Sequence, residues 1–233
     1  MGSLSESTAS TFLDFCFPSA TVDHGTVTHV SIETVTLTTI DGVDIAADIA
    51  PAAVEVPVRG AVVLAHPHPL HGGDRHNPII DRLFRALPSI GLHTLRLDFR
   101  GGGESGGEHD GGDAERLDVA AGIDFVSGLG VDEVWLVGYS FGALVSLNVI
   151  EPRVEGWIAI APPLSGRELA GRDPRPTLLL APAHDQFCPP ATVQERVTAW
   201  SNTDVESIDG TDHFLNGRLD EIVRRIVERL EVR

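Results

Sequence analysis

Ser140 is the first residue whose type and position could do chemistry. It lies in the segment Val-Trp-Leu-Val-Gly-Tyr-Ser-Phe-Gly, residues 134–142, where an apolar run turns into a helix-compatible stretch. A serine on so sharp a strand-to-helix turn needs small residues two positions before and after it, and Gly138 and Gly142 meet that demand. The turn lifts the hydroxyl above the sheet edge, and the first helical amides face a developing oxyanion. Ser140 is therefore a candidate nucleophile for acyl transfer.

The elements that must position this serine alternate along the chain. Residues 32–40 and 43–49 alternate apolar and polar side chains around Asp41-Gly42, which predicts a β-hairpin. Short apolar runs separated by helix-length segments follow, which predicts an α/β fold with a mostly parallel, doubly wound sheet. The expected strands are 61–65, 94–97, 134–137, 157–160, 177–180 and 205–208. The expected helices are 78–87, 113–127, 141–149, 191–201 and 219–232.

An antiparallel hairpin that leads into such a sheet, with a serine turn after the fifth strand, resembles the α/β-hydrolase fold. The resemblance implies that catalytic residues lie on loops at the carboxyl ends of the strands. We expect residues 1–25 to form an N-terminal segment and residues 26–233 to form a single domain. No lid domain is expected, because 161–175 is too short for the insertion that usually carries one.

The same resemblance implies a chain order of serine, acid and histidine. Ala-Pro-Ala-His-Asp-Gln-Phe-Cys-Pro follows the strand at 177–180 and puts Asp185 where the family carries its acid. Asp-Gly-Thr-Asp-His-Phe follows the strand at 205–208 and puts His213 where the family carries its base. A base must take the serine proton, and an acid must hold the tautomer of that base. We predict Ser140, Asp185 and His213 as the catalytic residues.

Three neighbouring residues are rivals for these roles. Asp209 and Asp212 could replace the acid, but they adjoin the histidine in sequence and are expected to shape its loop. His184 could replace the base, but it adjoins Asp185.

The loop at 65–73, Ala-His-Pro-His-Pro-Leu-His-Gly-Gly, follows the third strand, from which the family takes a second oxyanion N–H. Pro67 and Pro69 have no N–H, so we expect His68 to complete the oxyanion hole with the amide of Phe141. Leu70 is the fallback donor. Four residues are expected to contact the substrate: Leu70, Tyr139, Pro163 and Leu164.

Three segments narrow the resemblance. They are His-Pro-His-Pro-Leu-His-Gly-Gly with the following Asn77-Pro78, Leu-Asp-Phe-Arg-Gly-Gly-Gly-Glu-Ser at 97–105, and Gly-Tyr-Ser-Phe-Gly. Over about residues 32–230 the chain resembles small lid-less hydrolases near the dienelactone-hydrolase-like serine esterases. Dienelactone hydrolases proper carry a cysteine at the turn, and Ser140 favours ordinary ester chemistry. We expect Asp98, Arg100 and Glu104 to build a structural loop rather than to touch substrate.

His66, His68 and His71 support a competing zinc hypothesis, because a His-x-His-x-x-His pattern can bind zinc in metallo-β-lactamase-like hydrolases. Those enzymes place an acidic residue where this chain has Leu70, and the two prolines restrict convergence of the rings. We therefore expect no metal and no cofactor, and we expect these histidines to pack and hydrogen-bond within the loop.

Composition limits the partners. A net charge of −17 argues against nucleic acid and against anionic membranes, both of which attract basic surfaces. Residues 1–25 contain neither a basic, apolar signal pattern nor a membrane span, and Cys16 and Cys188 lie too far apart to define a disulfide framework. A cytoplasmic location is expected. The sequence leaves a homodimer open.

The sequence thus predicts a serine carboxylesterase-like hydrolase (EC 3.1.1 class) that cleaves short-chain or compact small-molecule esters through an acyl-enzyme. Two alternatives stay open: a peptidase or amidase with the same triad, and a non-catalytic binding protein with an α/β-hydrolase fold.

Overall fold

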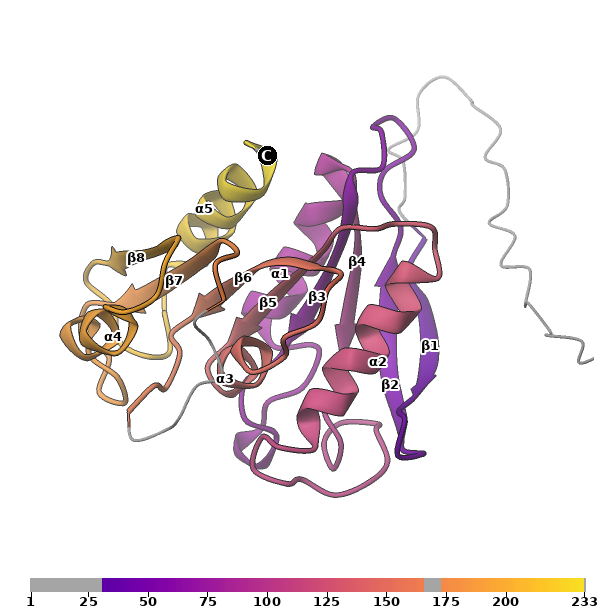
Figure 1. Cartoon of the computed structure of the whole chain (residues 1–233), viewed down its shortest axis with the longest axis horizontal. Coiled ribbons are helices and arrows are strands. Elements are labelled where there is room, and N and C mark those ends of the chain that lie inside the picture. Colours follow the sequence, from indigo (N-terminus) through magenta and orange to yellow (C-terminus); the bar gives the residue numbers. More distant parts are fainter. Residues whose placement is uncertain (1–30, 166–172, 233) are drawn as a thin grey trace, which may run out of the picture.

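One eight-stranded sheet organises the part of the chain that the computed structural model describes, residues 31–165 and 173–232 (Figure 1). The strand order is β1-β2-β4-β3-β5-β6-β7-β8, in which β1–β2 and β2–β4 are antiparallel and all other pairs are parallel. The strands are β1 (Glu33–Thr38), β2 (Asp44–Ala50), β3 (Gly60–Ala65), β4 (Leu92–Leu97), β5 (Val134–Tyr139), β6 (Val154–Ile160), β7 (Thr177–Pro182) and β8 (Thr203–Ile208). The predicted mostly parallel sheet with its N-terminal antiparallel hairpin is confirmed. The expected N-terminal segment 1–25 lies outside the described residues.

Helices cover both faces of the sheet, because successive strand side chains point to opposite sides. Along β3, Val62 and Leu64 join the core beneath α1 (Pro78–Ala86) and α5 (Leu219–Glu231). Val63 joins the core on the other face, beneath α2 (Glu115–Ser127), α3 (Phe141–Leu147) and α4 (Pro190–Val197). Figure 1 shows α2 in front of the sheet and α1 behind it. Two short 3-10 helices, η1 (Pro69–His71) and η2 (Leu87–Ile90), flank α1 in the chain.

Element ends differ from the sequence expectation where local hydrogen bonds intervene. The helix expected over 191–201 is α4, which begins at Pro190 and ends at Val197. Its last turn tightens, since Thr198 N–H donates to Glu195 O at 3.3 Å and Trp200 N–H to Val197 O at 2.8 Å. The helix expected over 78–87 passes into η2, with Pro88 in its first turn.

Strand register gathers the loops that carry the candidate residues. Ala65 of β3 pairs with Gly138 of β5, and Tyr139 pairs with Ile160 of β6. Pro182, the last residue of β7, pairs with Ile208, the last residue of β8. The loops after β3, β5, β7 and β8 therefore leave the sheet at one edge, where open α/β sheets bind ligands.

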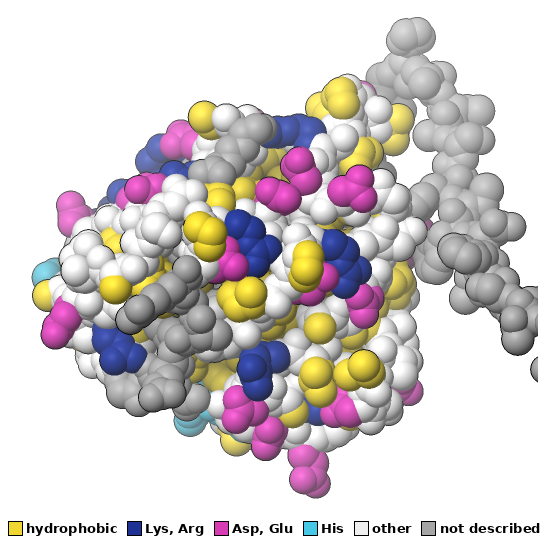
Figure 2. All heavy atoms as spheres, in the orientation of Figure 1, with side chains coloured by type: hydrophobic (Ala, Val, Ile, Leu, Met, Phe, Trp, Pro, Cys, Tyr) yellow, Lys and Arg dark blue, Asp and Glu magenta, His cyan; other side chains and the backbone are white. Residues whose placement is uncertain are grey.

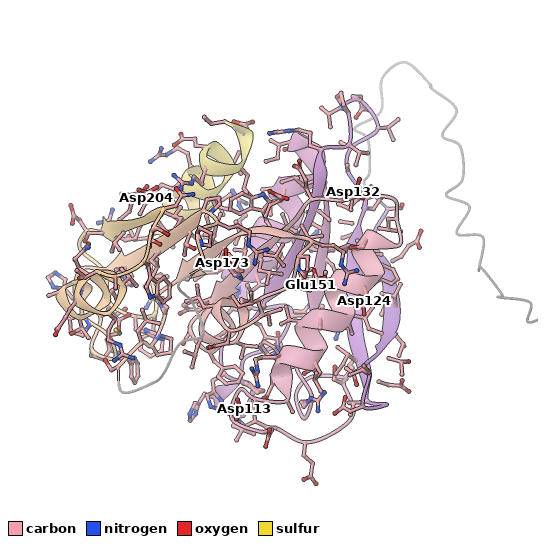
Figure 3. The ribbon with its side chains drawn as sticks, viewed as in Figure 1. Asp113, Asp124, Asp132, Glu151, Asp173 and Asp204 are labelled. Atoms are coloured by element: carbon pink, nitrogen blue, oxygen red, sulfur yellow. The ribbon has the colours of Figure 1, made fainter. Side chains whose placement is uncertain are left out.

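Charged side chains of both signs are interspersed on the face shown in Figure 2. Several acidic residues labelled in Figure 3 lie within 2.8 Å of an arginine nitrogen: Asp124 and Glu151 (both to Arg153), Asp173 (to Arg175) and Asp204 (to Arg229). Within the described ranges, no helix is long and apolar enough to cross a membrane.

Candidate active site

The turn between β5 and α3 holds Ser140 in a strained backbone conformation. Its φ of 53° and ψ of −115° lie where a residue with a Cβ rarely stays, and its N–H donates to Ile160 O at 2.8 Å. A Cβ on Gly138 would lie 2.4 Å from the backbone of Gly142, and one on Gly142 would lie 2.2 Å from Ala65 O. Strand and helix thus meet as closely as the sequence pattern requires, and only glycine fits at both positions.

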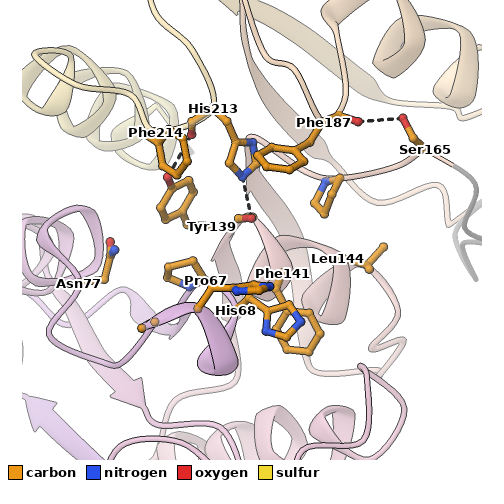
Figure 4. Close-up of a pocket in the computed structure, with 15 residues that line it drawn as sticks. Pro67, His68, Asn77, Tyr139, Phe141, Leu144, Ser165, Phe187, His213 and Phe214 are labelled. Carbon is orange, nitrogen blue, oxygen red and sulfur yellow. Dashed lines mark hydrogen bonds between the residues drawn. The ribbon is translucent and has the colours of Figure 1, made fainter.

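Ser140, His213 and Asp185 form a continuous hydrogen-bonded chain. Ser140 Oγ lies 2.8 Å from His213 Nε2 (Figure 4). His213 Nδ1 lies 2.8 Å from Asp185 Oδ2. The histidine and the acid come from the loops after β8 and β7, far from Ser140 in sequence. His213 is 6% exposed and Asp185 is 2% exposed, so water competes little for these bonds.

The second oxygen of Asp185 is also fixed. Asp185 Oδ1 accepts N–H bonds from Phe187 at 2.8 Å and Cys188 at 3.1 Å, which fixes the carboxylate plane toward the imidazole. The rival Asp212 instead accepts the N–H of Phe214 through Oδ1 at 3.0 Å and so shapes the histidine loop. The structure therefore brings Asp185 to the histidine, as the sequence order suggests.

Tyr139 holds the backbone of the loop that carries His213. Its hydroxyl donates to the backbone O of His213 at 3.0 Å (Figure 4). Burial raises the pKa of Tyr139 to about 12, and the nearby charges of Asp185 and Asp212 add to the effect. The phenol therefore stays protonated and remains a donor at any physiological pH.

The residues expected to supply the oxyanion hole, His68 and Phe141, lie side by side. Their ring centroids are 4.8 Å apart, and both residues line the same pocket (Figure 4). The amide of Phe141 is at the first position of α3, where an N–H has no acceptor within its own helix. His68 is the N-cap of η1, and its Nδ1 accepts Leu70 N–H at 3.3 Å.

His109 and Glu115 support this pair and were not foreseen from the sequence. The His109 ring lies 4.7 Å from His68 and 5.2 Å from Phe141, centroid to centroid. Its Nδ1 lies 2.6 Å from an oxygen of the fully buried Glu115. No local pattern marks His109, because it lies in an irregular loop after β4 that only the fold brings against α3.

Of the histidines at 66, 68 and 71, His68 and His71 lie against each other with ring centroids 4.7 Å apart, whereas His66 has other partners. His66 is fully buried, its Nε2 accepts Phe99 N–H at 2.9 Å, and its Nδ1 lies 2.5 Å from Pro67 O. Burial lowers the pKa of His66. Among residues 31–165 and 173–232, no group of three or more His, Cys, Asp or Glu side chains is arranged to hold a metal ion.

A pocket of about 760 Å³ opens above Ser140. It is bounded by the loop after β3, the start of α3 and the loops that carry Asp185 and His213 (Figure 4). Its described lining is Pro67, His68, His71, Gly72, Gly73, Asn77, Tyr139, Ser140, Phe141, Leu144, Pro163, Ser165, Phe187, His213 and Phe214. The volume is in the range that suits a small organic ligand.

Of the four residues expected to contact the substrate, two line the pocket and two do not. Tyr139 and Pro163 line the pocket, whereas Leu70 is 66% exposed outside it and Leu164 is fully buried in the core. Leu164 is not a pocket residue because its side chain belongs to the hydrophobic core on the α2–α3–α4 face of the sheet. Phe187 and Phe214 also line the pocket and were not predicted, although each lies within two residues of a predicted catalytic side chain.

This fold and the serine turn on it define an α/β hydrolase. A family model described as serine aminopeptidase, S33, matches residues 57–213, a stretch that contains Ser140, Asp185 and His213. The chain belongs to this family, and the resemblance to the α/β-hydrolase superfamily seen in the sequence is confirmed.

Relatives of known structure share the architecture. The chain is 30% identical to an α/β serine hydrolase homologue from Coxiella burnetii, with a TM-score of 0.75 over 85% of this chain and 97% of that one. It is 26% identical to XC6422 from Xanthomonas campestris, described as an α/β serine hydrolase without lid, with a TM-score of 0.78 over 88% and 98% of the two chains. The predicted lid-less fold is confirmed.

A third relative is known from its sequence. RP471 of Rickettsia prowazekii, described as an uncharacterized protein, is 29% identical over 189 residues, which cover 75% of this chain and 79% of that protein. The similarity therefore extends over most of both chains.

Proposed function

We propose that this hydrolase cleaves carboxylic esters through a Ser140-His213-Asp185 triad. The observation that carries the proposal is the hydrogen-bonded chain from Ser140 Oγ through His213 to Asp185, with two 2.8 Å steps. A serine hydroxyl in contact with an imidazole whose other nitrogen faces a buried carboxylate is the arrangement that activates a nucleophile.

In the first step, His213 Nε2 takes the proton of Ser140 Oγ while the oxygen attacks the ester carbonyl carbon. The carbonyl oxygen gains negative charge, and the amides of Phe141 and His68 stabilise it. The carbon–oxygen bond to the alcohol then breaks, and His213 returns the proton to the leaving oxygen. Water, deprotonated by the same imidazole, releases the acid and restores Ser140.

The pocket supports compact esters as substrates. About 760 Å³ suffices for a small molecule, and the pocket lies on the loops themselves rather than under a lid. Its described lining contains no Asp, Glu or Arg, although the chain carries a net charge of −17. An uncharged substrate suits such walls best.

A peptidase or amidase remains the second candidate, because the matching family is described as a serine aminopeptidase. The same triad can cleave an amide. Turnover of an acyl p-nitroanilide that equals or exceeds turnover of the matching p-nitrophenyl ester would favour this candidate over the esterase.

The test compares the wild type with Ser140→Ala on a short p-nitrophenyl ester and on a fluorescent organophosphonate. We expect kcat to fall by about 10⁴- to 10⁶-fold and covalent labelling to disappear, since triad members act as a unit. Ser146→Ala is the matched control, because this buried α3 hydroxyl has no hydrogen-bond partner among the described residues. Full activity of Ser140→Ala would refute the proposal. Absence of both turnover and labelling in the wild type would favour a binding protein.

A further inference from the structure

Two phenyl rings at the pocket are unusually exposed for their size. Phe187 is 52% exposed and Phe214 is 57% exposed, whereas Phe84, Phe99 and Phe141 are almost completely buried. Both exposed rings line the pocket. Apolar surface kept in water at a binding site is surface that a ligand can cover with a gain in free energy.

Both rings stand edge-on to the imidazole of His213. The Phe187 centroid lies 4.6 Å from that of His213 at an interplanar angle of 69°, and the Phe214 centroid lies 5.8 Å away at 87°. Figure 4 shows them on opposite sides of the imidazole. The proton donor to the leaving group thus lies between two apolar walls.

The backbone around each ring is fixed. Phe187 N–H donates to Asp185 Oδ1, and Phe187 O accepts the hydroxyl of Ser165 at 3.0 Å. Phe214 N–H donates to Asp212 Oδ1. The hydrogen bond that orients the acid therefore also places Phe187, and the walls are preorganised with the catalytic residues.

The proposed chemistry decides which part of the ester these walls meet. His213 Nε2 must protonate the leaving oxygen as the bond from the carbonyl carbon to that oxygen breaks. The alcohol therefore lies beside the imidazole, whereas the carbonyl oxygen lies toward Phe141 and His68. Because Phe187 and Phe214 flank the imidazole, the alcohol portion contacts their rings.

We propose that Phe187 and Phe214 form a leaving-group subsite for a flat, uncharged alcohol that bears an aromatic ring, such as an arylmethyl ester. This inference rests on the proposed ester hydrolysis. Ring edges and faces at this spacing favour an aromatic ring over a saturated ring of the same size.

The first experiment holds the acyl group constant and varies the alcohol. Benzyl acetate and cyclohexylmethyl acetate differ in the flatness of one ring, and acetate release gives kcat/KM for each. We expect the wild type to prefer benzyl by about tenfold, and Phe187→Ala and Phe214→Ala each to reduce that ratio about threefold or more. Ile40→Ala, at an exposed residue of the β1–β2 turn outside the pocket, is the control that keeps the ratio.

The second experiment separates the alcohol side from the acyl side. Once the acyl-enzyme has formed, the alcohol has left, so any change that a variant makes in the hydrolysis rate of the acetyl-enzyme should be the same whether benzyl acetate or cyclohexylmethyl acetate supplied the acetyl group. Benzyl alcohol added with the ester should capture the acyl group better than cyclohexylmethanol does. That preference should fall in both variants by the same factor as in the first experiment.

A wild-type ratio at or below one, or a ratio unchanged in both variants, would overturn the subsite. So would an effect that follows the acyl group in an acetate-to-butyrate series. In each of these cases Ser140-dependent ester hydrolysis survives, and the proposed function stands. Loss of ester turnover in the wild type itself would instead remove the proposed function and the subsite with it.

Discussion

Two buried groups of polar side chains lie near the same edge of the sheet. They differ in whether all of their hydrogen-bonding atoms already have partners within the protein. The triad consists of Ser140, Asp185 and His213, which lie just after β5, β7 and β8. The arginine cluster lies on β2, β4 and the loops after β3 and β4, and consists of Asp48, Arg75, Arg96 and Asp98 with Asp81 and Glu104 at its rim.

The arginine cluster is saturated. Asp48 accepts Thr34 Oγ1 at 2.9 Å and the guanidiniums of Arg75 and Arg96 at 3.2 and 2.9 Å. Asp98 accepts the N–H and the guanidinium of Arg75 and, at 3.0 Å, the N–H of Glu104. None of these residues lines the described pocket.

The triad instead ends at a hydroxyl that faces the pocket. Buried charged groups whose hydrogen bonds are all satisfied, as in the arginine cluster, are expected to stabilise the fold. A hydrogen-bonded chain that ends at a hydroxyl in a pocket, as in the triad, is expected to take part in a reaction. The comparison predicts that damage to the triad removes activity and spares stability, and that damage to the arginine cluster does the reverse.

Asp185→Asn should give the largest effect. The amide cannot stabilise the imidazolium, and it favours the wrong tautomer of His213, so we expect kcat on an ester to fall about 10⁴-fold. Asp212→Asn is the matched control, because its side chain serves its own loop. Initial-rate assays at neutral pH give kcat for both variants. Equal losses in the two variants would reassign the acid.

Asp98→Ala should give the largest loss of stability. It deprives the buried Arg75 of one partner and leaves two backbone N–H groups without their acceptor, so we expect a cost of about 3–5 kcal/mol in urea unfolding. Asp113→Ala, 88% exposed beside Arg116, should cost less than about 1 kcal/mol. Activity per phosphonate-labelled site should fall far less than in Asp185→Asn. A loss of activity without a loss of stability would contradict the assignment.

The two regions also differ in how far the sequence foretells them. The sheet and the hydrogen-bonded grouping of Ser140, His213 and Asp185 could be predicted because the glycines around Ser140 and the strand-loop order are local patterns. Of the arginine cluster, only Asp98 and Glu104 were expected to have a structural role, which their bonds to Arg75 fit. Arg100, expected in the same loop, pairs outside the cluster with Asp41 and Asp118. The cluster residue Asp48 lies in β2, and nothing in a single strand records which neighbour will face it.

The same limit explains the missed pocket residues. Phe187 and Phe214 adjoin predicted positions, but whether a ring points into the core or into the pocket depends on the backbone of its loop. His109 reaches Phe141 through a loop with no periodic pattern. Contacts between segments far apart in sequence determine where these three side chains lie. The local hydrophobic pattern of a single sequence does not record such contacts.

A smaller effect should appear at acidic pH. Burial alone would raise the pKa of Asp48, but the Thr34 hydroxyl and the charges of Arg75 and Arg96 outweigh it and hold the pKa below its usual range. The folded protein thus binds this proton less readily than the unfolded chain, whose Asp pKa is about 3.9. The stability from Asp48 is complete above that pH and is lost as the pH falls through the folded pKa.

Urea unfolding at a series of pH values tests this dependence. Asp48→Asn should be less stable near neutral pH and lose less stability on acidification than the wild type does. Asp220→Asn, an 86% exposed surface variant, should keep the wild-type slope. An unchanged slope in Asp48→Asn would show that other carboxylates carry the acid response.

Tyr139→Phe should give the smallest change in activity, and the same side chain can be followed both by kcat and by the ionisation of its phenol. The substitution removes the hydrogen bond to His213 O, worth about 0.5–1.5 kcal/mol, so we expect kcat to fall up to about tenfold with KM little changed. Tyr139 is the one tyrosine of the chain, so ultraviolet absorbance follows its phenol alone, and ionisation is expected at a pKa of about 12. Ionisation near 10, the usual value, would mean that the phenol is not buried beside the triad.

The double variant Tyr139→Phe with Asp98→Ala tests whether the two regions are independent. The triad and the arginine cluster share no hydrogen-bond partner among the described residues, so their effects on unfolding should add within about 0.5 kcal/mol. A larger coupling would mean that the loop after β3, which carries both Arg75 and His68, transmits strain between them. In that case the arginine cluster would also help to place the oxyanion donors, and its separation from catalysis would fail.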